Sequence, residues 1–158
     1  MARNPSNPAI DYLQQVAAPQ EVYDNPVNLF VANFLGTPPI NILKGRVENE
    51  KILINDVPVL NCKGVSDREV YVGIRPEGFI LDPKGAFVTN LQNVEVMGRD
   101  VSIVSTHTAS TKPTIRAIIS AEEKIDLASK TISFSLKPNK TFIFDFETEE
   151  RIYFEEVK

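Results

Sequence analysis

The chain is poor in the residue types that most often carry chemistry or cross-links. Its 158 residues include one cysteine, one histidine and no tryptophan. The single cysteine, Cys62, excludes a disulfide within the chain and fits a reducing compartment, so we expect a small, partly buried apolar side chain. The lone histidine, His107, has no cysteine, histidine or carboxylate companion at metal-ligand spacing, and the sequence therefore predicts no metal site.

Two further absences concern membranes and secretion. No apolar run approaches the ~18 residues of a membrane-spanning helix. The first residues, MARNPSNPAIDYL, contain no apolar segment of the kind found in a signal peptide. Their Asn, Pro and Ser content is typical of a disordered tail or of a segment added for expression, and we assign residues 1–14 to this class.

Charge of one sign is not concentrated anywhere in the chain. There are 17 Lys and Arg against 21 Asp and Glu, a net charge of -4 at pH 7, and the basic residues are scattered. A general nucleic-acid binder would show a basic face, and a single-strand binder would interleave basic and aromatic residues. Binding of single-stranded nucleic acid is therefore the weakest hypothesis that we consider, and we expect no nucleic-acid partner.

The motifs of common enzymes are missing. None of the seven glycines is followed by lysine, so the phosphate-binding loop G-x-x-x-x-G-K-S/T does not occur. No G-x-S-x-G sequence provides a nucleophile. Paired carboxylates such as Glu122–Glu123 are adjacent in sequence, so their side chains diverge. The sequence predicts no catalytic residue, and we expect no cofactor on this chain.

Two short helices are predicted near the start of the chain. Pro19 suits a first helical position, followed by residues 20–24, and a second helix is expected from Val27 to Leu35. Phe30 and Phe34 lie on one apolar face of this second helix, and we expect them to anchor it on the rest of the protein. Gly36 and the following prolines are typical of a helix end.

After Pro39 the sequence is predicted to be mainly β. Apolar runs become short, β-branched and separated by turn residues, a pattern that favours a barrel or sandwich over a parallel α/β sheet. The predicted strands are Asn41–Asn49, Lys51–Ile54, Pro58–Asn61, Glu69–Ile74, Gly78–Leu81, Phe87–Met97, Val101–Thr108, Thr114–Ser120, Thr131–Leu136, Thr141–Phe146 and Arg151–Glu155.

Two turn regions carry the polar residues of greatest interest. In the first, a strand enters a proline-initiated turn, where a guanidinium and a carboxylate lie two residues apart. These two groups could pair or hydrogen-bond neighbouring backbone to hold the turn, or they could form a contact across a subunit boundary. In the second, Glu95 alternates with apolar neighbours and is expected on the exposed face. Both patterns favour a structural role, with an interface role as the alternative. The candidate interface or regulatory residues are Gly73, Arg75, Pro76, Glu77, Glu95, Gly98 and Asp100.

Several sequence blocks together resemble one known family. The first block has Gln15, Pro19, Glu21, Tyr23 and Pro26 in the order Q-x-G-x-P-x-E-x-Y-x-x-P, with Ala17 where glycine is common. The second, F-V-A-x-F-x-G-x-P-x-x-N, matches at Phe30, Val31, Ala32, Phe34, Gly36, Pro38 and Asn41. The turn G-I-R-P-E is intact at Gly73–Glu77, and V-E-x-x-G-x-E/D matches at Val94, Glu95, Gly98 and Asp100. A closing L-F-D followed by T-G is echoed by Ile143-Phe144-Asp145 and Thr148, but Glu149 replaces the glycine.

These blocks resemble the ATP-binding subunits of bacterial carbohydrate ABC importers, of the maltose and glycerol-phosphate type. The resemblance covers the chain from about Gln15 to its end. It implies an OB-like β-barrel, often called a TOBE domain, preceded by one or two short helices. Residues 15–38 would then be a helical linker that ends a nucleotide-binding domain absent from this sequence, and residues 39–158 would form the regulatory barrel.

The resemblance also implies a function and partners. The chain would be a non-catalytic regulatory and dimerisation domain, and its parent would be an importer ATPase that binds ATP and Mg²⁺ on its nucleotide-binding domain. Partners would be that domain, a second copy of the chain, a regulatory protein and, indirectly, the membrane subunits, at the cytoplasmic face of the membrane. The alternative is a domain that senses a small ligand, such as an oxyanion, a sugar or a sugar phosphate.

Overall fold

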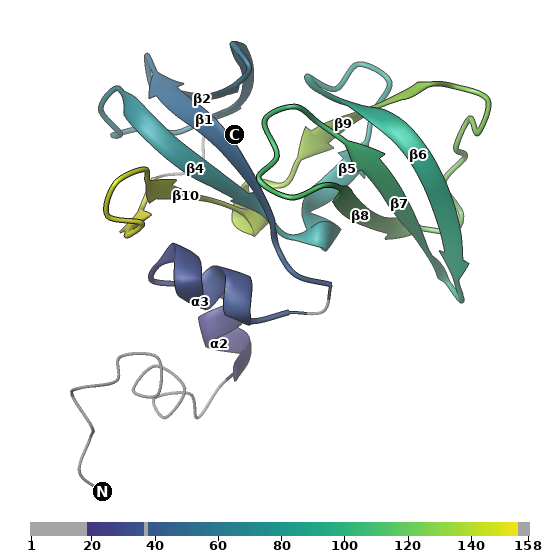
Figure 1. The fold of residues 1–158 in the computed structure, drawn as a ribbon, viewed down its shortest axis with the longest axis horizontal. Helices are drawn as coiled ribbons and strands as arrows, with labels where there is room; N and C mark the ends of the chain where they lie inside the picture. The colour runs from purple at the N-terminus through teal and green to yellow at the C-terminus, as the bar shows by residue number, and fades with distance from the viewer. Residues whose placement is uncertain (1–18, 37, 155–158) are drawn as a thin grey trace, which may run out of the picture.

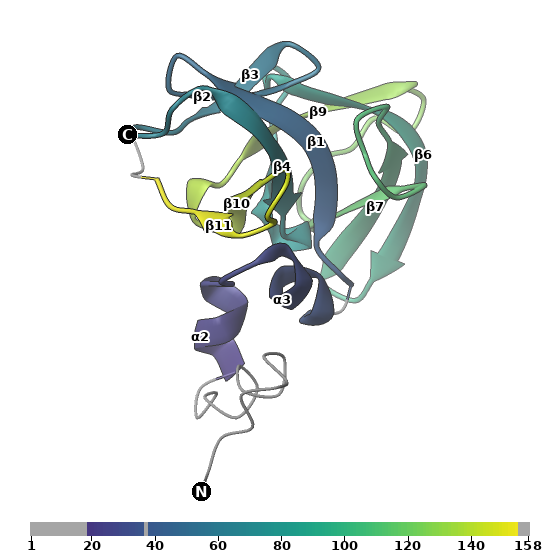
Figure 2. The ribbon, with the colours of Figure 1, turned by 60° about the vertical axis from the view of Figure 1, so that its left-hand side comes forward.

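The structure is a computed structural model, and it describes residues 19–36 and 38–154. Two antiparallel sheets enclose the main core, and two short helices lie below them (Figures 1 and 2). The expected tail 1–14, the first residues of the expected linker and the last residues of the expected barrel lie outside the described part.

The two helices are α2 (Pro19–Asp24) and α3 (Leu29–Phe34). Asn28 has extended backbone and caps α3, because its side-chain oxygen accepts a hydrogen bond from the backbone N–H of Val31 at 2.8 Å. The chain leaves α3 through Gly36, whose φ of +107° suits a residue without a Cβ atom. The second helix is therefore shorter than the predicted span from Val27 to Leu35.

The first sheet has six strands in the order β11-β10-β4-β1-β2-β3. Two of its hairpins have two-residue turns in which both central residues have positive φ, as right-twisted hairpins require. Asn49 and Glu50 form the first turn, and Asn55 and Asp56 form the second. The strands of this sheet are β1 (Asn41–Glu48), β2 (Lys51–Ile54), β3 (Val57–Asn61), β4 (Arg68–Ile74), β10 (Thr141–Asp145) and β11 (Arg151–Ile152).

The second sheet has five strands in the order β5-β9-β6-β7-β8, and its end strands β5 and β8 lie next to each other. This curled sheet confirms the expectation of a mainly β, barrel-like fold behind two short helices. The strands are β5 (Phe79–Leu81), β6 (Phe87–Met97), β7 (Asp100–Thr106), β8 (Ile115–Ser120) and β9 (Thr131–Leu136), and two 3-10 turns, η1 (Pro76–Gly78) and η2 (Pro138–Lys140), lie close to the junction of the sheets.

Two apolar cores result from the strand patterns. The main core lies between the sheets and receives alternate residues of strands such as β9, where Ile132, Phe134 and Leu136 are buried. A second, smaller core lies between the helices and the outer face of the six-stranded sheet. It consists of Ala32, Ile40, Ile42, Phe142 and Phe144, with Leu29 and Tyr71 packed against it. Strand β10 is buried on both faces because it contributes to both cores.

The prediction that Phe30 and Phe34 anchor the second helix on the barrel is wrong within this chain. Their side chains are 56% and 58% exposed and stack on each other with ring centroids 5.9 Å apart. Val31 and Ala32 are the buried residues of α3 instead. The sheet packs against the side of the helix with the smaller side chains, which lets the helix backbone approach the barrel closely. Among the described residues, no helix is long and apolar enough to cross a membrane.

Cys62 lies in the main core as an apolar side chain, as predicted, but it is fully rather than partly buried. Burial, with a smaller effect of the Glu50 charge, raises the pKa of its thiol to about 11. We therefore expect the native protein to react very slowly with a thiol reagent at about pH 8, because the thiolate is the reactive species. Denaturant should expose one fully reactive thiol. A fast reaction of the native protein, counted spectrophotometrically, would contradict this burial.

Candidate functional site

Arg75 connects the barrel to both helices. It follows β4, and its side chain has 0% exposed surface. Its Nη1 donates hydrogen bonds to the carbonyls of Ala32 at 3.0 Å and Leu35 at 2.9 Å, and its Nη2 donates to the carbonyl of Tyr23 at 2.8 Å. These carbonyls lie at the C-terminal ends of α2 and α3, where backbone oxygens have no partner within the helix. We call this arrangement the Arg75 clamp.

The clamp is strengthened by an aromatic ring and a close backbone approach. The guanidinium carbon of Arg75 lies 3.8 Å from the centre of the Tyr23 ring, a cation–π distance. A Cβ atom at Gly36 would lie 2.9 Å from that same ring, so the absence of a side chain permits this packing. Burial lowers the pKa of Arg75 from its ordinary value, although the nearby Tyr23, Glu77 and Asp24 act in the opposite direction.

Glu77 binds the tyrosine rather than the arginine. The Tyr23 hydroxyl donates to the Glu77 carboxylate, with oxygen–oxygen distances of 2.7 and 3.0 Å. Lys140 from η2 lies 3.9 Å from Glu77 and 3.5 Å from Asp24. Burial raises the pKa of Tyr23 to about 12, and the hydrogen bond to Glu77 adds to this effect. Arg75 and Glu77 thus hold the turn and the helices through contacts within the chain.

Gly73 and Pro76 have packing roles at the same place. A Cβ atom at Gly73 would lie 2.8 Å from the end of the Ile40 side chain and 3.1 Å from Phe144, so any larger residue would require these side chains of the second core to shift. Pro76 is buried at the first position of η1, where a missing backbone N–H is tolerated. The structure therefore brings together Gly73, Arg75, Pro76 and Glu77 around the helix junction.

Backbone pairing also attaches the helices to the barrel. The segment between the helices runs beside the start of β11, where the Arg151 N–H donates to Val27 at 3.0 Å and the Leu29 N–H donates to Glu149 at 3.0 Å. Beyond α3, the Lys112 ammonium donates to the Ile40 carbonyl at 2.8 Å and to Asn33 at 2.9 Å. The helices and the barrel are thus joined at several separate points.

The other predicted residues lie apart, on the β6–β7 hairpin. Gly98 has a φ of +68° at the first central position of its two-residue turn, as a type II′ hairpin requires. Asp100 is exposed at the start of β7. Glu95 is exposed, as predicted, and forms an ion pair with Arg116 of β8 at 3.2 Å.

Asn41 and Arg116 connect the β6–β7 hairpin to the region of the Arg75 clamp. The sequence analysis did not identify this connection. The Asn41 amide is buried and donates to the carbonyls of Ile74 and Arg116, both at 3.0 Å. Its oxygen accepts the Arg116 N–H at 2.9 Å. Asn41 matched a family motif, but nothing in the sequence indicated that it bridges the two sheets.

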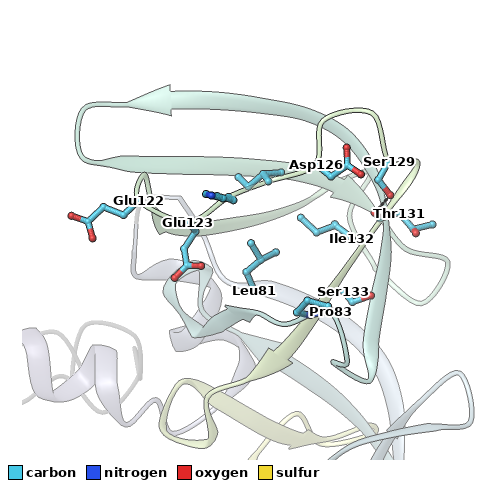
Figure 3. A pocket seen from close by; sticks show the side chains of 11 residues that line it. Leu81, Pro83, Glu122, Glu123, Asp126, Ser129, Thr131, Ile132 and Ser133 are labelled. Atoms are coloured by element: carbon cyan, nitrogen blue, oxygen red, sulfur yellow. Dashed lines mark hydrogen bonds between the residues drawn. The ribbon is translucent and has the colours of Figure 1, made fainter.

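A separate hollow of about 590 Å³ lies beside β5 and β9 (Figure 3). Leu81 and Ile132 form its apolar floor, while the loop 122–129 forms its rim. The carboxylates of Glu122 and Asp126 point in different directions, so the polar groups do not converge on one point. A ligand site usually has a few convergent polar groups, and the hollow does not show them. Among the described residues, no three His, Cys, Asp or Glu side chains form a group that could hold a metal ion.

Fold and junction together define a barrel-like β domain that carries a clamped pair of helices. No family model matches the chain. It is 30% identical over 145 residues to the sn-glycerol-3-phosphate import ATP-binding protein UgpC of Jannaschia sp. (strain CCS1), covering 89% of this chain and 39% of that protein. It is 31% identical over 147 residues to UgpC of Escherichia coli O6:K15:H31 (strain 536 / UPEC), covering 88% and 40%. It is also 31% identical over 162 residues to the uncharacterized ABC transporter ATP-binding protein YurJ of Bacillus subtilis (strain 168), covering 89% and 42%.

The chain is therefore homologous to a part of sn-glycerol-3-phosphate import ATP-binding proteins and of an ABC transporter ATP-binding protein, which confirms the resemblance read from its motifs. It spans about two fifths of the length of these relatives. Each match covers 88% or 89% of this chain. The residues of the Arg75 clamp thus lie in a chain that is related to import ATP-binding proteins over nearly all of its length.

Replacing Arg75 should destabilise the whole fold. Arg75→Met leaves three carbonyls without a donor, and we expect a loss of about 3 kcal/mol in the free energy of unfolding. Arg75→Lys should lose less, because it keeps a charge but not the planar fork. The matched control is Arg46→Met, which removes exposed ion pairs to Glu48 and Asp56 and should cost much less, because solvent screens exposed ion pairs. Equal losses in denaturant melts of Arg75→Met and Arg46→Met would refute the clamp.

The Tyr23–Glu77 bond should appear in the pH dependence of stability. The pKa of Tyr23 rises from 10.0 to about 12 on folding, so its stabilising contribution is complete below pH 10 and disappears as the pH approaches 12. The difference in phenolate absorbance between the wild type and Tyr23→Phe should give this raised pKa, and Glu77→Gln should lower it. Titration of Tyr23 near pH 10 in the native wild type would show that the bond is absent.

Proposed function

We propose that this chain is the non-catalytic regulatory and dimerisation part of an ATP-binding subunit in an ABC transporter that imports a sugar or a sugar phosphate. The similarity to import ATP-binding proteins over 89% of the chain supports the transporter assignment. The missing phosphate-binding loop supports a role without catalysis on this chain.

The observation that carries the proposal is the Arg75 clamp. By the resemblance, the helical segment ends the nucleotide-binding domain of the parent subunit. The clamp and the second core hold that segment on the barrel through buried hydrogen bonds. A movement of the nucleotide-binding domain would thus be passed to the barrel as a rigid-body movement, which is what a regulatory domain of a motor requires.

In this proposal the mechanism is mechanical. ATP and Mg²⁺ act on the nucleotide-binding domain of the parent, at the cytoplasmic face of the membrane and in contact with the membrane subunits. Paired barrels hold two such domains together while these open and close. A regulatory protein that binds the barrels more tightly when the domains are open shifts the equilibrium between the open and closed arrangements toward the open one.

The tip of the β6–β7 hairpin supports a contact role. Val96 is 77% exposed and Met97 is 54% exposed, which is unusual for apolar side chains on a strand. They lie directly beside the predicted interface residues Glu95, Gly98 and Asp100. An apolar patch with a polar border is typical of a surface that contacts another protein.

The dimerisation part of the proposal can be tested by sedimentation equilibrium of the purified chain. We expect a reversible dimer that Asp100→Arg weakens, because the reversed charge lies at the hairpin contact. Glu147→Arg makes a change of the same kind at an exposed carboxylate between β10 and β11 of the other sheet, and it should leave the dimer unchanged. A monomer at every concentration would remove dimerisation from the proposal, and a melting temperature raised by ATP would contradict a non-catalytic chain.

A further inference from the structure

A second guanidinium, that of Arg151, lies half-buried at the start of β11 with few partners. Its central carbon lies 4.6 Å from the Phe142 ring centre and 4.5 Å from the Tyr153 ring centre. Its Nη1 donates to the Pro26 carbonyl at 3.3 Å, and its buried Nε has no hydrogen-bond partner in the described part of the chain. No carboxylate of the described residues forms an ion pair with it.

This arrangement differs from that of Arg75, whose Nε also has no partner among the described residues but whose two Nη groups reach three carbonyls. Rings stacked on a guanidinium cover its faces but leave its in-plane N–H groups available. Partial burial of a cation costs desolvation free energy, and an anion that pairs with its free donors offsets this cost. An oxyanion is the best complement, because two of its oxygens can accept parallel N–H bonds from one guanidinium. Burial also lowers the pKa of Arg151, as expected for a cation with no carboxylate beside it.

A small hollow adjoins this guanidinium. Its volume is about 160 Å³, and its walls come from the end of α2, from η2, and from β10 and β11. The polar lining residues are Asp24, Asn25, Asn139, Thr141 and Arg151. This volume corresponds to a few water molecules, so it fits an inorganic ion or a phosphate group rather than a whole sugar.

The charges at the hollow favour an anion. Asp24 is the one carboxylate among the lining residues that the structure describes, and it lies 3.5 Å from the Lys140 ammonium. That ion pair offsets the charge of Asp24 and leaves Arg151 as the uncompensated charge. The exposed amides of Asn25 and Asn139 can supply further N–H donors at the rim.

We propose that this hollow binds a small oxyanion, either inorganic phosphate or the phosphate group of a phosphate monoester, on the Arg151 guanidinium. Asn25 belongs to the helical segment, whereas Asn139 and Arg151 belong to the barrel, so the bound anion would join the two next to the Arg75 clamp. Binding itself does not depend on the proposed transporter role. Its use as a regulatory signal does rest on that role, and it would give the small-ligand alternative a defined place in the fold.

The test is a titration of the full chain with inorganic phosphate at constant ionic strength, followed by the NMR signals of arginine Nε–H groups. We expect a saturable shift of the Arg151 signal and a rise of the melting temperature. Arg151→Met should abolish both effects, and Arg151→Lys should weaken binding by about tenfold or more because it lacks the planar fork. Arg46→Met, at an exposed arginine, should bind phosphate like the wild type.

Several outcomes would overturn the inference. These are an Arg151 signal that does not respond, a response that does not saturate, or equal affinity in Arg151→Met. If Arg151→Met does not fold, the wild-type NMR titration still decides. Binding that appears only after the double change Glu155→Gln and Glu156→Gln would show that the chain's own carboxylates occupy the site, which also refutes it. A parallel titration with glycerol phosphate identifies which source of phosphate is preferred. If the wild-type chain dimerises but does not bind phosphate, this inference is refuted and the proposed function is not.

Discussion

The structure depends on one buried cation placed where two helices end. The C-terminal carbonyls of a short helix carry partial negative charge and have no partners within the helix. Arg75 supplies donors to three such carbonyls at once, and it does so from the barrel. Without this side chain, α2 and α3 would be two helices of six residues each, too short to be stable alone. The clamp thus makes the helices part of the barrel domain.

Other features follow from the need to bring the helices close. Ala32 is the small residue that faces the sheet, Gly73 leaves space for the second core, and Gly36 leaves space for the Tyr23 ring. The Tyr23–Glu77 bond then places one carboxylate near the guanidinium, and the Lys140 ammonium lies 3.9 Å from that carboxylate. The turn Gly73–Glu77 is therefore a structural joint, and any functional role that it has would act through the position of the helices.

Most strands could be predicted from the sequence, whereas the partners at the joint could not. Lys51–Ile54, Phe87–Met97 and Thr131–Leu136 have the predicted bounds, and the other described strands begin or end within a few residues of the prediction. Alternation and turn chemistry involve residues close in sequence, so they can be read directly. The prediction for Phe30 and Phe34 was wrong because periodicity identifies an apolar stripe but does not indicate which part of it meets the barrel.

Local chemistry in the sequence thus determined the mainly β class, the turn positions, the two short helices and the lack of a phosphate-binding loop. Tertiary structure decided that Arg75 binds helix carbonyls rather than Glu77, that Glu77 binds Tyr23, and that Asn41 joins the two sheets. It also placed Arg151 against two aromatic rings beside a small hollow. The physical reason is distance along the chain. A contact between residues 23 and 77, or 41 and 116, forms only when packing brings them together, and no local pattern records that packing.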